Sequence, residues 1–180
     1  MLKALRRSSA HRRAGERLWA AISERARDPR FFRDLGVPDS FNGRFDMVAL
    51  HGWLVLDRLK AEGGREVSQA LVNSLFYGFE DALREQGAGD MGMTRRIKKI
   101  ADAFYGRLHA YGEAAGYDGL ANALLRNVYG GEAAFRDAAG RLADYVVTVR
   151  SRLADASLVG GEVDFGTMPP GHQRHSHERK

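Results

Sequence analysis

Residues 95–115, RRIKKIADAFYGRLHAYGEAA, decide the fold of this chain. Apolar side chains recur every three or four positions along this stretch, which places them on one face of an α-helix. A glycine follows at position 116, where a helix commonly ends. The stretch therefore predicts an amphipathic helix. Its apolar face consists of Ile97, Ile100, Ala101, Phe104, Leu108 and Tyr111.

Glycine, proline and capping residues divide the rest of the chain into further helical segments. Asp28 followed by Pro29 marks a helix start, because Asp caps free N–H groups and Pro has no N–H group to leave unpaired. No segment shows the strong alternation of a strand, and the connections are short. These features predict an all-α fold, a single-domain antiparallel bundle of about six to seven helices. The other expected helices cover residues 10–27, 29–35, 44–62, 65–86, 119–129 and 132–158.

Positive charge is concentrated at the two ends of the chain. The formal net charge is +5, yet residues 1–13 alone hold five Lys and Arg residues and no acidic one. The C-terminal end is also basic, so the body between the ends is slightly acidic. We expect a basic N-terminal arm over residues 1–13, a helical domain over 14–159 and a flexible tail over 160–180. Such ends can touch an anionic surface without defining a nucleic-acid-binding fold, and no DNA partner is expected.

No pattern in the sequence predicts catalysis. The chain contains no cysteine, which excludes disulfides, thiolate catalysis and cysteine-ligated metals. Common nucleotide-binding, zinc-protease and serine-hydrolase motifs are absent. His172, His175 and His177 are close in sequence but lack a rigid frame, so we expect adventitious metal binding at most. His51 and His109 are expected to be core or surface residues. We therefore predict no enzymatic activity, no cofactor and no metal site.

A basic cluster lies within residues 95–115, on the helix face opposite Ile97 and Ile100. Such a cluster can bind RNA, a phospholipid headgroup or an acidic protein, or it can be a solvated face. It keeps open an alternative function, an RNA- or ribosome-binding helical module. The cluster consists of Arg95, Arg96, Lys98 and Lys99.

Aromatic and methionine side chains provide a second candidate surface. Residues 45–56 are apolar nearly all round a helix, which is typical of a helix that is buried on two sides or binds something. Met91 and Met93 lie in a glycine-containing loop, and flexible thioethers suit an adaptable apolar surface. Most aromatic residues are expected in the core. The candidate client-binding side chains are Trp53, Phe76, Phe79, Met91, Met93, Phe104, Tyr105, Tyr111 and Tyr129.

Several collinear phrases resemble the ubiquinol–cytochrome c chaperone family. The phrases are residues 45–56 (FDMVALHGWLVL), 83–90 (LREQG, then GD), 103–111 (AFYGRLHAY) and 123–131 (ALLRNVYGG). The resemblance covers residues 14–155 and implies a bacterial-type member. Members are helical proteins that assist newly made cytochrome b on its way into respiratory complex III. Mitochondrial members act with a small partner protein near the ribosomal exit.

The resemblance implies a client-binding surface and brings no catalytic residues. Gly106 would let a backbone approach closely. Arg126 and Asn127 would hold carbonyl groups of the loop at residues 130–131. Alternatively, these motifs are signatures of helix–helix packing. The residues that the resemblance implies are Tyr105, Gly106, Arg107, Arg126, Asn127 and Tyr129.

The implied function is that of an assembly chaperone that binds newly made cytochrome b during biogenesis of complex III. No apolar run reaches the ~18 residues of a membrane span, and the N-terminus lacks the apolar segment of a secretory signal. We therefore expect a cytoplasmic protein peripheral to the inner membrane, or one on the matrix side in a eukaryote. Candidate further partners are a small partner protein, the ribosome and the anionic membrane surface.

Overall fold

The computed structural model describes residues 2–85 and 90–168 of the protein, with side chains for residues 6–85 and 92–168. The described residues form seven α-helices and one 3-10 helix, with no strand. This confirms the predicted all-α, single-domain bundle. The helices are α1 (Leu2–Ala26), α2 (Pro29–Arg33), α3 (Phe41–Ala61), α4 (Arg65–Glu85), α5 (Asp90–Gly112), α6 (Gly116–Val128), η1 (Ala133–Phe135) and α7 (Arg136–Leu153).

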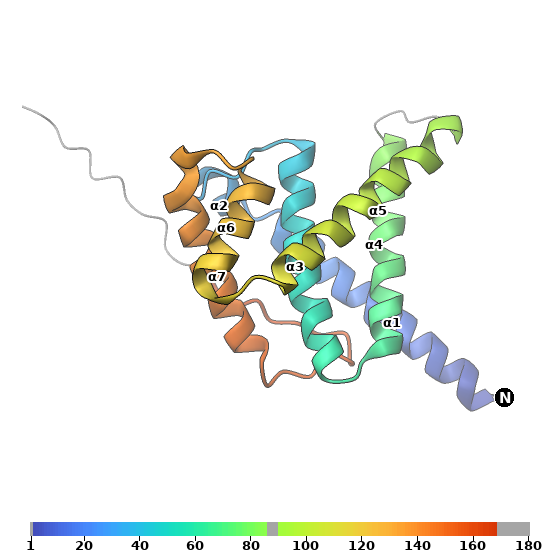
Figure 1. Ribbon diagram of the computed structural model, residues 1–180. Coiled ribbons are helices and arrows are strands. Elements are labelled where there is room, and N and C mark those ends of the chain that lie inside the picture. Colours follow the sequence, from blue (N-terminus) through green and yellow to red (C-terminus); the bar gives the residue numbers. More distant parts are fainter. Residues whose placement is uncertain (1, 86–89, 169–180) are drawn as a thin grey trace, which may run out of the picture.

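Helix α3 is the central element of the bundle (Figure 1). Helix α1 crosses behind α3 and α4, while α4 and α5 lie on one side of α3 and α2, α6 and α7 lie on the other. Most residues of α3 between Phe45 and Val55 are buried. The apolar character of residues 45–56 therefore reflects a helix that is covered on several sides.

Capping side chains set the starts of α2 and α3. Asp28 Oδ1 accepts the Arg30 backbone N–H at 3.0 Å, and a proline opens α2 as predicted. Ser40 Oγ accepts the Gly43 N–H at 3.2 Å. Because this serine caps the first turn, α3 begins at Phe41 rather than at the predicted residue 44. The earlier start brings Phe41 to the outer edge of the bundle.

The helix bounds differ from the expected ones at both ends of the chain. Helix α1 begins at Leu2 rather than at residue 10. Nothing before residue 10 breaks the helix, and Ser9 Oγ donates to the Arg6 carbonyl at 2.9 Å within it. The basic residues 6–13 thus share one helix with the core residue Leu18. The division into an arm, a domain and a tail stays a prediction.

Residues 154–168 form a segment without regular structure that we call the C-terminal strap. Helix α7 ends before it, at Leu153, and the side chains of Arg58 on α3 and of Glu62, which caps the C-terminal end of α3, bind the strap backbone. Arg58 Nε donates to the Ala156 carbonyl at 2.7 Å, and Glu62 Oε1 accepts the strap N–H of Leu158 at 2.8 Å. These two bonds turn the chain out of α7.

The rest of the C-terminal strap is also packed. Arg17 and Arg25 of α1 donate hydrogen bonds to strap carbonyls, and Phe165 is buried. These contacts hold the backbone of residues 160–168, which lie within the segment expected as a tail, against α1. Residues 169–180, including the three tail histidines, lie outside the described residues.

Phe165 completes an aromatic cluster that we call the closed cluster, made of Phe31, His51, Tyr145 and Phe165. His51 Nδ1 lies 2.7 Å from the Met47 carbonyl oxygen and Nε2 lies 2.7 Å from Tyr145 Oη. Because the carbonyl only accepts, Nδ1 carries the proton and the tyrosine hydroxyl donates to Nε2. The rings of Phe31 and Phe165 lie 5.3 and 5.2 Å from the imidazole. Complete burial lowers the pKa of His51 to about 4.

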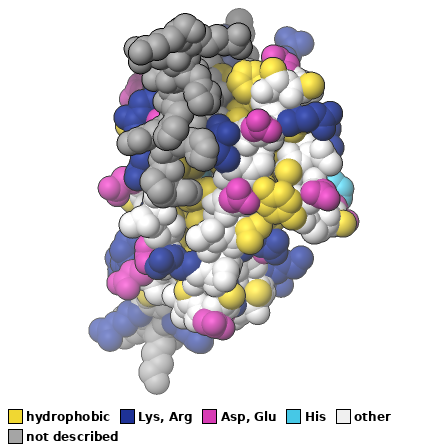
Figure 2. Space-filling model, turned by 90° about the vertical axis from the view of Figure 1, so that its left-hand side faces the viewer, with side chains coloured by type: hydrophobic (Ala, Val, Ile, Leu, Met, Phe, Trp, Pro, Cys, Tyr) yellow, Lys and Arg dark blue, Asp and Glu magenta, His cyan; other side chains and the backbone are white. Residues whose placement is uncertain are grey.

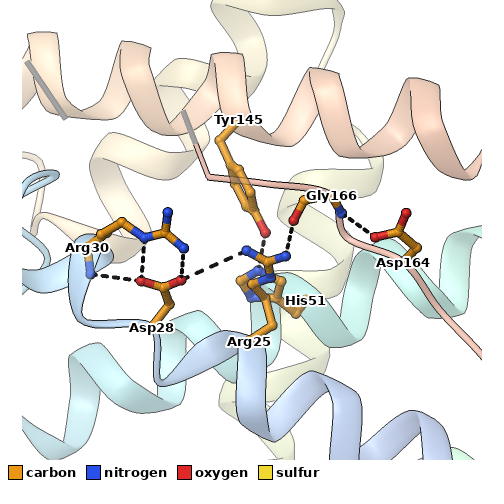
Figure 3. Close-up of polar contacts among 7 residues, drawn as sticks. All are labelled: Arg25, Asp28, Arg30, His51, Tyr145, Asp164 and Gly166. Carbon is orange, nitrogen blue, oxygen red and sulfur yellow. Dashed lines mark hydrogen bonds and ion pairs between the residues drawn. The ribbon is translucent and has the colours of Figure 1, made fainter. Parts of the chain in front are cut away.

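An ion-pair network borders the closed cluster (Figure 3). Arg30 Nη2 lies 2.5 Å and Arg25 Nη1 3.9 Å from Asp28 Oδ2. The hydrogen bonds from Arg30 hold the pKa of Asp28 below its usual range. Arg25 also binds the Gly166 carbonyl, so α1, α2 and the C-terminal strap are joined at one point.

Candidate functional site

Five of the predicted client-binding side chains lie in the core. Each has 6% or less of its surface exposed, and of the five only Phe79 borders a groove at the surface. They support the surface residues from behind. These five are Trp53, Phe79, Phe104, Tyr111 and Tyr129.

Three other predicted residues form an aromatic surface patch, the Tyr105 face, made of Phe76, Tyr105 and Gly106. Tyr105 is 51% exposed and its ring centroid lies 6.2 Å from that of the half-buried Phe76. A Cβ at Gly106 would meet no atom within 4 Å, so the glycine leaves open space beside the tyrosine. Met93 is half-buried, and the side chain of Met91 lies outside the described residues.

Arg107 is held by the chain itself. Its Nε lies 2.5 Å from Asp46 Oδ1 on α3, and its guanidinium stacks over the Phe45 ring at 4.9 Å. Burial raises the pKa of Asp46 to about 6, and Arg107 opposes this shift. At neutral pH the pair therefore joins α3 to α5 as an ionised, mostly buried contact.

The residues implied at the end of α6 are divided between surface and core. Asn127 Nδ2 donates to the Ala123 carbonyl at 2.9 Å, so it bonds back into its own helix rather than to the following loop. Tyr129 Oη donates to the Leu35 carbonyl at 2.8 Å. Arg126 is exposed. Asn127 and Tyr129 thus stabilise the fold, and Arg126 is the residue of this set on the surface.

A groove with a mainly apolar lining opens between α1, the start of α3 and the end of α4. Its volume is about 430 Å³. Sequence reasoning placed only Phe79 of its residues in a binding surface, because the groove is built from three helices that are distant in the sequence. We call it the α1–α3–α4 groove. It is lined by Trp19, Ala26, Arg27, Asp39, Ser40, Phe41, Arg44, Phe45, Val48, Gly78, Phe79, Ala82 and Glu85.

Aromatic rings make up the floor of this groove. The ring centroid of Phe79 lies 6.3 Å from that of Trp19 and 5.5 Å from that of Phe45. A Cβ at Gly78 would overlap the Trp19 indole, so only glycine lets the indole lie against α4. A glycine in the middle of an otherwise good helix was the signal in the sequence that could have located this contact.

The rim of the groove is charged and carries one exposed aromatic side chain. Phe41 is 41% exposed at the rim. Arg44 Nε lies 2.9 Å from Asp39 Oδ1, and this pair is exposed. Arg27 is exposed on the α1 wall and Glu85 on the α4 wall. The groove therefore combines an apolar floor with charged sides, as binding sites for apolar segments do.

Phe79 connects the groove to the Tyr105 face. Its ring centroid lies 5.9 Å from that of Phe76 and 6.3 Å from that of Phe104. Phe104 in turn lies 5.5 Å from Tyr105. One continuous aromatic cluster thus reaches the surface in two places.

The basic cluster of α5 is exposed as predicted, and Ile97 and Ile100 face inward. None of its four residues forms an ion pair with another described residue. The side of the molecule with α2, α6 and α7 differs, because charges of both signs are interspersed there and hydrophobic side chains form small groups (Figure 2). Within the described residues, no three His, Asp or Glu side chains gather where they could hold a metal. No described helix is long and apolar enough to cross a bilayer.

The sequence is similar to named proteins over most of its length. Protein CBP3, mitochondrial, of Saccharomyces cerevisiae is 30% identical over 152 residues, which cover 78% of this chain and 45% of that protein. Ubiquinol-cytochrome-c reductase complex assembly factor 1 of Xenopus laevis is 29% identical over 119 residues, 64% of this chain and 60% of that protein. The chain spans 40–60% of the length of the curated relatives it matches.

A solved structure shares the fold. The crystal structure of the Cbp3 homolog from Brucella abortus superposes with a TM-score of 0.80 at 34% identity, covering 93% of this chain and 98% of that one. The sequence model of the family described as ubiquinol-cytochrome c chaperone matches residues 33–159. The chain therefore belongs to the ubiquinol-cytochrome c chaperone family.

Proposed function

We propose that this protein assists the assembly of respiratory complex III by binding newly made cytochrome b. Family membership supports this proposal, since relatives are named complex III assembly factors. The observation that carries it is the open α1–α3–α4 groove beside the Tyr105 face. We assign the client to these two surfaces.

An open aromatic surface is suited to what such a chaperone must do. A membrane protein exposes apolar helices before it is inserted, and these helices associate with other apolar surface in water. Aromatic side chains cover such helices with large contact area and few rotatable bonds. An open groove lets the client leave again, whereas an enclosed cavity would retain it.

We further propose that the exposed basic residues hold the protein beside the inner membrane, on the cytoplasmic or matrix side. Arg6, Arg7 and Arg13 are exposed on the first turns of α1. Each basic residue near an anionic leaflet contributes about 1 kcal/mol of attraction. A small partner protein or the ribosome is a further proposed contact for the same charges.

A second candidate function is that of an RNA- or ribosome-binding module. The α5 cluster favours it, because its exposed residues Arg95, Arg96, Lys98 and Lys99 form no ion pairs among the described residues. This function predicts RNA binding that weakens steeply with salt. It also predicts that charge reversal of Arg95 and Lys99 abolishes that binding.

Photo-crosslinking from single positions in cells tests the primary proposal. A photo-reactive amino acid is placed at Phe41 on the groove rim, at Tyr105, or at Val147, which is 47% exposed on α7 and serves as the control. We expect cytochrome b to be captured from the first two positions and not from the third. Deleting the gene should lower assembled complex III and leave other respiratory complexes unchanged. Capture of cytochrome b from position 147 alone, or normal complex III in the deletion, contradicts the proposal.

A further inference from the structure

We propose that Arg27 recognises a carboxylate on the occupant of the α1–α3–α4 groove, and that this occupant is an apolar helix bearing an acidic side chain beside its apolar face. The inference rests on the proposed client-binding function and adds a chemical criterion to it. Arg27 would thereby select which apolar segment enters the groove.

Arg27 lies where the α1–α3–α4 groove meets several other hollows of the surface. It follows the last turn of α1 and its side chain is exposed. It lines the groove and also three neighbouring hollows of about 760, 570 and 630 Å³. A guanidinium at this junction can reach an occupant from several directions.

Neighbouring arginines already have a carboxylate partner within the chain. Arg33 Nε lies 2.6 Å from Asp34 Oδ1, Arg44 pairs with Asp39, and both Arg25 and Arg30 bind Asp28. Among the described residues, Arg27 has no such partner. Unlike these four arginines, Arg27 therefore has its guanidinium free of a carboxylate partner within the described residues.

The opposite wall of the groove carries a negative charge, which determines how an acidic helix can be oriented in it. Glu85 on α4 also lines the groove and has no ion pair with a described residue. A carboxylate on the occupant is attracted on the α1 wall and repelled on the α4 wall. The acidic side chain must therefore lie on the flank that faces Arg27.

The chemistry of the lining favours a helix with a carboxylate over a purely apolar one. A guanidinium presents two parallel N–H donors that match the two oxygens of a carboxylate. A helix bound over the aromatic floor would exclude water beside this contact, which strengthens the ion pair. An apolar helix seated on Trp19 and Phe79 would fill the floor and bring its flank to the rim.

Trp19 supplies an optical reporter for the test. The chain has two tryptophans, and Trp53 is buried against Tyr111, away from the groove. In a Trp53→Phe background, the fluorescence of the full-length protein reports Trp19 alone. The probes are three synthetic helical peptides with the same leucine stripe and with Glu, Gln or Lys on its flank. Dodecanoate serves as a non-peptide carboxylate.

We expect the Glu peptide to bind about tenfold more tightly than the Gln peptide at low salt, equivalent to about 1.4 kcal/mol. Arg27→Gln should abolish this preference, whereas Arg95→Gln on α5 and Glu85→Gln on the other wall should retain it. Arg27→Glu should transfer the preference to the Lys peptide. Thermal unfolding of each variant verifies that it is folded.

Two results overturn the inference. One is a Glu preference that survives Arg27→Gln, and the other is the absence of binding by any peptide, whether or not dodecanoate binds in an Arg27-dependent way. These outcomes are independent of the client's identity, which the crosslinking in cells tests separately. Peptide selectivity with no capture of cytochrome b would refute the proposed function and leave the Arg27 criterion intact.

Discussion

Helix α3 contributes to two aromatic clusters that differ in how they are covered. On one side His51 enters the closed cluster, where Phe165 of the C-terminal strap seals it from solvent. On the other side Phe45 joins Trp19 and Phe79 in the floor of the α1–α3–α4 groove, which no segment among the described residues covers. The first cluster is closed, whereas the second borders an open groove although Phe45 and Phe79 are themselves only 8% and 6% exposed.

The two regions also differ in whether their polar side chains have partners within the chain. Both nitrogens of His51 have partners within the closed cluster. At the groove, Arg27 and Glu85 have no ion-pair partner among the residues that the structure describes. A region whose bonds are complete stabilises the fold, whereas one with unused charge and apolar surface is suited to bind another molecule.

The largest expected change in stability comes from removing the Phe165 ring. Phe165→Ala should lower the free energy of unfolding by about 4 kcal/mol, because it leaves a cavity over the closed cluster. Phe41→Ala at the groove rim should cost less than about 1 kcal/mol, since this ring is 41% exposed. Urea denaturation measures both values. Equal losses would show that the groove rim is part of the core.

The pH dependence of stability probes the closed cluster without changing it. The pKa of His51 is about 4 in the folded protein and 6.5 in the unfolded chain, so its contribution is complete above pH 6.5 and is lost as the pH falls toward 4. This loss amounts to about 3 kcal/mol. Asp46 has a raised pKa of about 6 and therefore acts with the opposite sign between pH 6 and 3.8.

Replacing Asp46 with a residue that does not titrate leaves His51 as the group that sets the pH dependence of stability in this range. In Asp46→Asn, the unfolding free energy should decline steadily from pH 6.5 to 4.5, whereas the native protein should show a flatter profile. The pKa values of Asp28, Asp34 and Asp164 are all lowered, so these groups act below that window. A flat profile in the variant would mean that His51 is protonated without cost, in conflict with its burial.

The backbone of the C-terminal strap provides an effect of similar size with a matched control. Gly161 has a φ of +88°, and a Cβ there would lie 2.6 Å from Ala14 Cα. Gly130 has a φ of +64° with open space around it. Gly161→Ala should therefore cost about 3 kcal/mol and Gly130→Ala about 1 kcal/mol in unfolding free energy. A similar cost at both sites would argue that the strap does not press on α1.

The smallest expected effect is the loss of one hydroxyl in the closed cluster. Tyr145→Phe leaves the ring in place but removes the donor to His51 Nε2, which should cost about 1–2 kcal/mol. The pKa of His51 should rise, since the donor that stabilises the neutral ring at Nε2 is then missing. Chemical denaturation gives the first value and imidazole NMR the second. No change in stability would exclude this hydrogen bond from the fold's stabilising contacts.

The helices were largely predictable from the sequence and the groove was not. The apolar period of residues 95–115 and the Asp28 cap are local signals, and α5 and α2 follow them. The packed strap depends on contacts between residues more than 90 positions apart, such as Arg58 with Ala156, which no local pattern reveals. The groove likewise brings Trp19 against Phe79. The one local sign of that contact in the sequence is Gly78, whose missing side chain leaves room for the indole.

We propose that the open α1–α3–α4 groove is the surface with which this family member binds its client. This proposal is tested most directly by the level of assembled complex III in cells whose only copy of the protein carries Ala82→Phe, which fills the groove beside Trp19. Val147→Phe on α7 adds a ring to the opposite side and is the control. We predict a clear fall in complex III for Ala82→Phe and a normal level for Val147→Phe, with both proteins folded and equally abundant. Normal complex III in the Ala82→Phe cells would contradict the account.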